Sequence, residues 1–316
     1  LFKDKQILFN LVTFSPVNPM RIAAIDCGSN SLKCLIAEKR GEDFNCLKDL
    51  RFQTRLASAL NTNGFLSATA IEKTITILKH LQENEFPAYK IEEIRAVGTE
   101  AIRQAANKQE VVDRIFRETG IQLSVINEAQ ETFLEWKGVL SGLKKPLQPI
   151  TIFDSGGAST EIINGNKGLI HKATCFPVGA VNFTQRYVHS DPISPTDFEE
   201  LVRKIFQSLP QSFMIQDTFI GAGGGVYVCA CVASGGKINS PEEAEGYEIT
   251  LSELERQINL YQHTNLEQRK QILGMGSEYA DIMLAAVLIY WTLLKASGKE
   301  KFLVSTRGIR YGLIAI

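Results

Sequence analysis

The sequence predicts an α/β protein made of two similar halves. Short apolar strands alternate with helical segments along the chain, a pattern typical of layered α/β folds. The order strand, turn, return strand, helix, strand, helix starts at residue 21 and again at residue 149. With 316 residues, 44% of them hydrophobic, the chain is long enough for two ordinary domains, each with its own core.

The elements of the first half follow from apolar runs and helical spacing. Extended segments predict five strands, over residues 21–25, 32–37, 51–60, 94–97 and 123–126. Ile71, Ile75 and Leu78 lie at helical spacing and predict an amphipathic helix over 68–85. The remaining helices of this half are predicted over residues 100–106, 109–119 and about 129–140. Gly120 suits the end of the second of these three.

The second half repeats the scheme and ends in helices. Its strands are predicted over residues 149–153, 161–163, 218–220 and 302–305. Its helices are predicted over residues 196–209, 251–261, 266–273, 281–296 and 309–314. The longest uncharged apolar run, 282–294, is too short to span a bilayer, so we expect a buried helix there and no membrane partner.

Residues 142–149 are the predicted linker between two domains, because they hold a glycine, two lysines and two prolines directly before a new strand. The first domain is expected over 20–141 and the second over 142–316. A C-terminal helix over about 306–316 could pack back on the first domain. We expect residues 1–19 to form a loose extension, with Met20 as a candidate natural start.

Charge and cysteine usage exclude several classes of protein. The net charge of −1 and a pI of about 6.5 argue against a dedicated nucleic-acid partner. None of the six cysteines forms a C-x-x-C pair or pairs with a histidine at zinc spacing, so we expect buried, reduced thiols and a cytoplasmic location. A small anionic ligand remains compatible with this composition.

Two stretches carry most of the functional signal, Ile25-Asp-Cys-Gly-Ser-Asn-Ser31 and Phe153-Asp-Ser-Gly-Gly-Ala-Ser-Thr-Glu161. In each, an apolar strand ends in an aspartate and continues into a Gly/Ser turn. The aspartates, Asp26 and Asp154, could hold Mg²⁺ directly or through water. The turns expose backbone N–H groups and hydroxyls that suit phosphate oxygens. The turn residues expected to bind phosphate are Gly28, Ser29, Asn30, Ser31, Gly156, Gly157 and Ser159.

Three further positions are weaker candidates. Glu161 is either an exposed strand carboxylate or a more distant contact to the Mg²⁺ or its water. Thr99 and Arg103 lie four residues apart where a strand enters a helix, which favours an anion, although a surface arginine is commonly just solvated. The glycine run Gly221–Gly225, with Gly223 and Gly224 at its centre, is either a tight turn or a place where a nucleoside or phosphate lies against backbone.

These residues together resemble the exopolyphosphatase / guanosine pentaphosphate phosphohydrolase family of the actin and sugar-kinase superfamily. Residues 25–31 are similar to the family's I-D-x-G-S-N-S loop and residues 153–161 to its D-I-G-G-G-S-T-E loop. Further ordered similarities lie at residues 96–103, 176–181, 220–225 and 305–312. The resemblance covers about residues 20–316 and implies two ribonuclease H-like (actin-like ATPase) domains with a cleft between them.

The resemblance also implies an activity, namely Mg²⁺-dependent hydrolysis of the terminal phosphoanhydride of polyphosphate or guanosine pentaphosphate. It selects Glu131 as the catalytic glutamate, a choice over Glu128 or Glu135 that the pattern of residues alone cannot make. Arg103 would balance charge. Longer members carry an additional C-terminal helical domain, which we do not expect in these 316 residues. A homodimer is compatible with the resemblance.

Two alternatives stay open at this point. One is an ATP-dependent kinase of the same superfamily, with Gly221–Gly225 under the adenosine. The other is a non-catalytic nucleotide-binding regulator, which two departures from the family pattern favour: Ala158 replaces a glycine of the second loop, and Tyr311 replaces a glutamate.

Overall fold

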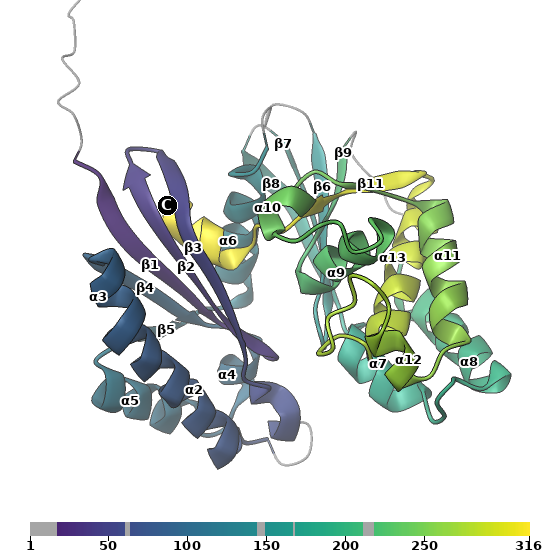
Figure 1. Cartoon of the computed structure of the whole chain (residues 1–316), viewed down its shortest axis with the longest axis horizontal. Helices are drawn as coiled ribbons and strands as arrows, with labels where there is room; N and C mark the ends of the chain where they lie inside the picture. Colours follow the sequence, from purple (N-terminus) through teal and green to yellow (C-terminus); the bar gives the residue numbers. More distant parts are fainter. Residues whose placement is uncertain (1–17, 61–63, 144–148, 167, 211–217) are drawn as a thin grey trace, which may run out of the picture.

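The computed structural model describes residues 18–60, 64–143, 149–166, 168–210 and 218–316. Most of the predicted extension, residues 1–17, and most of the predicted linker, residues 144–148, lie outside this range. The described residues form two mixed sheets with helices around them (Figure 1). Among these residues, no helix combines the length and the apolar composition that crossing a membrane requires.

The first sheet has five strands in the order β3-β2-β1-β4-β5. They are β1 Met20–Cys27, β2 Ser31–Arg40, β3 Asp43–Gln53, β4 Glu93–Gly98 and β5 Leu123–Val125. The first three run antiparallel, and β4 and β5 add to β1 in parallel. Its helices are α2 Ala68–His80, α3 Phe86–Tyr89, α4 Glu100–Gln104, α5 Lys108–Thr119 and α6 Glu128–Leu140.

Alternation along β1 divides the core of this lobe between two faces. Ala23, Ile25 and Cys27 lie in the cluster that includes the apolar stripes of α2 and α5. Ile22 and Ala24 lie in the cluster formed with α6 and α14 (Ile309–Ala315). The last helix of the chain therefore packs on the sheet that the first strand begins.

The second sheet repeats the order of the first, β8-β7-β6-β9-β11, with β10 added at the edge. Its strands are β6 Ile150–Ser155, β7 Thr160–Asn166, β8 Leu169–Phe176, β9 Thr218–Ala222, β10 Glu248–Thr250 and β11 Lys301–Ser305. Its helices are α7 Ala180–Tyr187, α8 Pro195–Ser208, α9 Gly224–Ala233, α10 Pro241–Ala244, α11 Leu251–Gln262, α12 Leu266–Lys270 and α13 Met283–Ser297.

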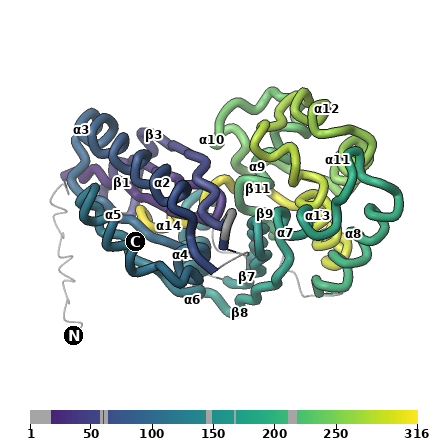
Figure 2. Tube along the Cα trace, turned by 90° about the horizontal axis from the view of Figure 1, so that it is seen from below, coloured from purple at the N-terminus to yellow at the C-terminus, as the bar shows by residue number. Residues whose placement is uncertain are grey.

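Helix α6 packs on both lobes. Leu134 joins the core of the first lobe, whereas Trp136 and Val139 pack against the second sheet. Figures 1 and 2 show α6 between the first sheet and the β7–β8 side of the second. Gly138 lets α6 and α14 approach closely, because a Cβ there would lie 2.1 Å from the carbonyl oxygen of Gly308.

The predicted strands and helices are confirmed with small shifts in their bounds, apart from a few errors. The third strand is β3, Asp43–Gln53, not residues 51–60, and Leu56–Ala59 form a 3₁₀ helix. The prediction missed β8, β10, α7, α9 and α10. Both β3 and β8 form one edge of their sheets and expose many residues, so their apolar signal is weak.

The prediction for the cysteines is correct for four and wrong for two. All six are free, but Cys46 and Cys175 are exposed, because they lie on the edge strands β3 and β8 rather than in the core.

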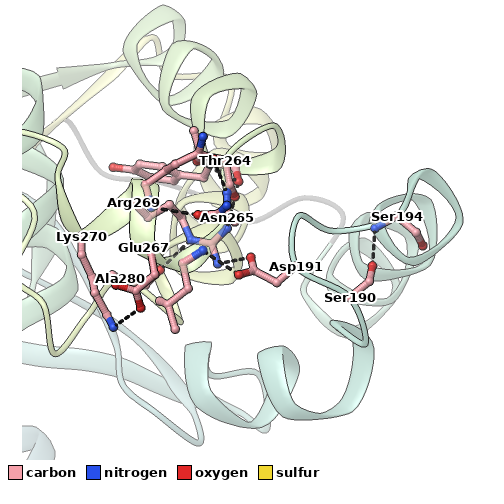
Figure 3. Close-up of polar contacts among 12 residues, drawn as sticks. Ser190, Asp191, Ser194, Thr264, Asn265, Glu267, Arg269, Lys270 and Ala280 are labelled. Atoms are coloured by element: carbon pink, nitrogen blue, oxygen red, sulfur yellow. Dashed lines mark hydrogen bonds and ion pairs between the residues drawn. The ribbon is translucent and has the colours of Figure 1, made fainter.

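A buried arginine joins three segments of the second lobe (Figure 3). The guanidinium of Arg269, on α12, donates hydrogen bonds to the carbonyl oxygens of Tyr261, Thr264 and Ala280. It also pairs with Asp191 at 2.9 Å. These contacts fix the loops around α12 to the end of α11 and the start of α13.

Candidate active site

The two Gly/Ser turns have the same local structure. In the first, the Gly28 N–H donates to the Ser31 carbonyl at 3.1 Å, and in the second the Gly156 N–H donates to the Ser159 carbonyl at 2.9 Å. Each turn joins the first two antiparallel strands of its sheet. Both turns are therefore closed by the same backbone hydrogen bond, whereas Ser29 and Asn30 of the first turn correspond to Gly157 and Ala158 of the second.

Both turns line one cleft of about 400 Å³. The cleft is bounded by β1, β2, β3, α4 and α6 on one side and by β6, β7, β8, α9 and α13 on the other. Every residue predicted for the site lines it. They are Asp26, Gly28, Ser29, Asn30, Ser31, Thr99, Arg103, Glu131, Asp154, Gly156, Gly157, Ser159, Glu161, Gly223 and Gly224.

The pairing of strands places side chains of opposite charge beside the two hairpin aspartates. In the first sheet Asp26 pairs with Lys33, and Lys33 pairs with Arg51. In the second sheet Asp154 pairs with Glu161, and Glu161 pairs with Cys175. Each row starts at the hairpin aspartate and runs outward across the sheet. One row is basic beyond its aspartate and the other is acidic.

Asp26 is 3% exposed, yet one of its carboxylate oxygens, Oδ1, has no hydrogen-bond partner among the described residues. The other, Oδ2, lies 3.5 Å from Lys33 Nζ. A buried carboxylate oxygen without a partner is costly unless a ligand satisfies it. Because Asp26 lines the cleft, its Oδ1 is suited to a cation or to the water bound to one.

The carboxylates of the second lobe hold protons more tightly than usual. Burial and the negative charge of Asp26 raise the pKa of Asp154 to about 6, against the opposing effect of Lys33. Burial and Asp154 raise the pKa of Glu161 to about 7, and its Oε1 accepts a hydrogen bond from the Cys175 thiol at 3.1 Å. A divalent cation would offset the unfavourable free energy of burying Asp154 and Glu161 in their ionised forms.

Glu131 lies in the first turn of α6, where a closed capping box fixes the start of the helix. Asn127 Oδ1 accepts from the Gln130 N–H at 2.9 Å, and Gln130 Oε1 accepts from the Asn127 N–H at 3.0 Å. The Glu131 carboxylate accepts a hydrogen bond from Arg103 at 2.7 Å. Burial raises the pKa of Glu131, and the Arg103 charge opposes this rise.

Positions 223 and 224 leave no room for a side chain and therefore require glycine. Gly223 has a φ of 102°, and a Cβ on it would lie 2.6 Å from Asp154 Oδ1. A Cβ on Gly224 would lie 2.1 Å from the Tyr279 hydroxyl. The glycine run therefore lets the start of α9 lie directly against the side chains of the site.

The cleft also holds residues outside the predicted site, among them Lys33, Arg51, Glu135 and Tyr279. A signal for Lys33 was present, because it follows Asp26 by seven residues, just as Glu161 follows Asp154. Glu135 lies one helical turn after Glu131 and is 6% exposed, with Oε1 unpartnered among the described residues. Burial and Asp154 raise the pKa of Glu135 well above its usual range.

The charge of the cleft fits a divalent cation. Among the described residues, seven carboxylates and three basic side chains line it, which leaves a formal excess of four negative charges. No three metal-binding side chains within the described ranges converge closely enough to enclose a metal. Mg²⁺ needs no such cage, since it keeps several waters and binds one or two carboxylates plus phosphate oxygens. Asp26 and Asp154 suit this mode.

Comparisons with known proteins agree with the resemblance. The model of the Ppx/GppA phosphatase family matches residues 35–315. Exopolyphosphatase 2 of Mycobacterium tuberculosis is 32% identical over 54% of this chain and 56% of its own length. The guanosine-5'-triphosphate,3'-diphosphate pyrophosphatase of Vibrio cholerae is 27% identical over 92% of this chain and 58% of its own length.

A solved structure, that of the Aquifex aeolicus PPX-GPPA enzyme, superposes with a TM-score of 0.82 at 28% identity, covering 94% of this chain and 99% of that one. The predicted two-domain, actin-like fold is thus confirmed. The chain spans about half the length of the curated relatives that it matches. The match over residues 35–315 shows that the chain belongs to the Ppx/GppA phosphatase family.

Proposed function

We propose that the protein is an Mg²⁺-dependent phosphoanhydride hydrolase that releases the terminal phosphate of inorganic polyphosphate, guanosine pentaphosphate or both. The observation that carries this proposal is the meeting of two equivalent Gly/Ser hairpins in one cleft with Glu131 and Arg103. Relatives named for exopolyphosphatase and guanosine pentaphosphate hydrolysis support it.

The hairpins would hold the terminal phosphate. Ser29, Asn30 and Ser31 on one side, and Gly157 and Ser159 on the other, offer N–H and hydroxyl donors to its oxygens. Phosphoryl transfer depends mainly on positioning and on stabilising charge, and donors from two sides supply the positioning.

Glu131 would orient the attacking water and accept its proton. Its carboxylate lies in the cleft, and the raised pKa brings it closer to the range useful for a general base. Arg103, which now pairs with Glu131, can hold the carboxylate in place and add positive charge beside the phosphate.

Asp26 and Asp154 would hold Mg²⁺, with Glu161 as a contact through water. When bound, the ion would neutralise the excess carboxylates and polarise phosphate oxygens. Without such a cation, the negative cleft would repel a polyanionic substrate.

The two departures from the family pattern leave this chemistry in place. Ala158 has an ordinary negative φ, so its side chain causes no backbone strain. Tyr311 is 3% exposed, donates to Asp49 and does not line the cleft. Neither residue therefore favours a non-catalytic regulator.

A single assay tests the proposal. Phosphate release is measured from polyphosphate, guanosine pentaphosphate and ATP, with Mg²⁺ and with excess chelator. We expect Mg²⁺-dependent release from at least one of the first two. Transfer of labelled phosphate from ATP to an acceptor other than water would instead identify a kinase, and no turnover with any substrate would leave only a binding protein.

A further inference from the structure

Arg51 is a cation of the cleft without a direct ion-pair partner among the described residues, and the charges of Glu278, Asp26 and Asp49 act on it from farther away. Of the three basic side chains that line the cleft, Arg103 pairs with Glu131, and Lys33 lies near Asp26. Arg51 forms no ion pair with any described residue. Its guanidinium instead lies 4.8 Å from the centre of the Tyr279 ring, across the cleft on the second lobe.

Tyr279 supplies a second unsatisfied group at the same place. It is 4% exposed and lines the cleft, but its hydroxyl has no hydrogen-bond partner among the described residues. Gly224 makes room for this arrangement, because a Cβ there would lie 2.1 Å from the Tyr279 hydroxyl and 2.6 Å from Arg51 Nη1. A buried hydroxyl donor beside an unpaired guanidinium suits an anion.

The position of Arg51 and Lys33 relative to the hairpins indicates which anion they would bind. Arg51 and Lys33 continue the row that begins at Asp26, so Arg51 lies two strand spacings, roughly 10 Å, from the hairpin aspartate. A phosphoanhydride chain with its terminal phosphate between the hairpins would extend along this row. Among the described residues that line the cleft, no other basic side chain lies on the row.

We propose that Arg51, Lys33 and the Tyr279 hydroxyl form a subsite for the phosphate next to the one that is released. This inference rests on the proposed function and deepens it. Water attacks the terminal phosphorus, and its proton goes to Glu131. The bond from that phosphorus to the bridging oxygen breaks, and the electron pair stays with the neighbouring phosphate. The subsite neutralises the charge that this leaving phosphate gains, so it selects phosphoanhydrides over phosphate monoesters.

Binding of two small anions tests the subsite. Calorimetry with Mg²⁺ measures the dissociation constants of orthophosphate, which fills one phosphate position, and of imidodiphosphate, a non-hydrolysable two-phosphate ligand. Arg51→Met should raise the dissociation constant of imidodiphosphate about tenfold or more and leave that of orthophosphate unchanged. Tyr279→Phe, which keeps the ring, should raise it by a smaller factor, about threefold.

Matched variants separate this role from a structural one. Arg40→Met removes the same charge from the exposed end of β2 and should change neither constant. Arg51→Lys keeps the charge and should recover most of the affinity. Equal losses for the two anions would show that Arg51 only joins the lobes, and would overturn the subsite. So would unchanged binding in Arg51→Met, or failure of the wild type to bind imidodiphosphate more tightly than orthophosphate.

These measurements need no turnover. The phosphate-release assay can therefore fail, and end the hydrolase proposal, while the binding comparison still decides whether the subsite exists.

Discussion

Asp26 and Asp154 occupy equivalent positions, but their neighbours give them different properties. Lys33 faces Asp26 across the first hairpin, whereas Glu161 faces Asp154 across the second. Burial and the negative charge of Asp26 raise the pKa of Asp154 to about 6, and the Lys33 charge opposes this rise. The internal duplication therefore supplies two aspartates, and the charged groups of the first hairpin affect how readily Asp154 ionises.

Asp154→Asn should change how stability depends on pH and on Mg²⁺. The pKa of Asp154 rises from 3.8 to about 6 in the folded protein, so between these pH values the folded state binds more protons than the unfolded chain. The free energy of unfolding of the metal-free protein then falls as pH rises from about 4 to 6. Asp154→Asn should make this fall shallower, as measured by chemical denaturation.

Bound Mg²⁺ should restore the stability that is lost when Asp154 ionises, so its effect should appear only at pH values where Asp154 is ionised. We expect the Mg²⁺-induced rise in melting temperature to be larger at pH 7.5 than at pH 5, and to be much reduced in Asp154→Asn. Asp43→Asn, at an exposed position at the start of β3, should behave like the wild type. An unchanged Mg²⁺ response in Asp154→Asn would remove this residue from the metal site.

Glu131→Gln should lower turnover by about 10²-fold or more, because the amide cannot accept the proton of the water. Imidodiphosphate affinity should stay within a few-fold of the wild type. The matched control is Glu128→Gln, three residues earlier at the exposed start of α6, and it should retain activity. Near wild-type turnover in Glu131→Gln would exclude it as the base.

Sequence reasoning found the two hairpins, whose residues line the cleft, because each hairpin is local. Asp26, the turn and Lys33 are close in the chain, so spacing alone relates them. Arg51 reaches the same row only through the pairing of β3 with β2, which includes a register shift at Ile36/Ala37. Such a shift moves side chains between faces and leaves no signal in the sequence.

At the scale of elements, the sheets show which patterns are informative. Central strands such as β1 and β6 are continuously buried and were predicted from their apolar runs. Many residues of the edge strands β3 and β8 are exposed. The prediction misplaced β3 and missed β8. Edge strands keep polar residues that limit pairing with other chains, and the same residues weaken the prediction.

A substitution at Arg269 tests how strongly this side chain stabilises the loops around α12. Arg269→Met should lower the free energy of unfolding by about 3 kcal/mol, because three carbonyl oxygens and Asp191 lose a buried donor. Lys270→Met, the next residue, breaks only an exposed pair with Glu267 and should cost less than about 1 kcal/mol. Equal small effects in denaturation experiments would contradict the structural role of Arg269.

At the scale of the whole molecule, the lobes are joined by two helices that are distant in sequence. Helix α6 belongs to the first lobe and also packs on the second sheet, and α14 returns the chain to the first lobe after β11. Arg310 of α14 forms a two-point ion pair with Asp49 of β3. The last strand of the second lobe therefore leads directly into the core of the first.

A substitution at Ile314 tests how much the packing of α14 on the first lobe contributes to stability. It is fully buried against the first sheet, so Ile314→Ala should lower the free energy of unfolding by about 2–4 kcal/mol, although the residue lies two positions from the last. Ile316→Ala is the matched control, since that side chain is 55% exposed and should cost less than about 0.5 kcal/mol. Similar melting temperatures for the two variants would contradict the packing of α14.

The packing of α14 on the first lobe determines where fluorophores should be attached to measure changes in the width of the cleft. The first strand and the last helix pack in one core of the first lobe (Figure 1). Fluorophores attached at positions 20 and 315 would keep a constant separation whatever the other half does. A dye on β8 or α8, paired with one on α5, would instead report every change in the width of the opening.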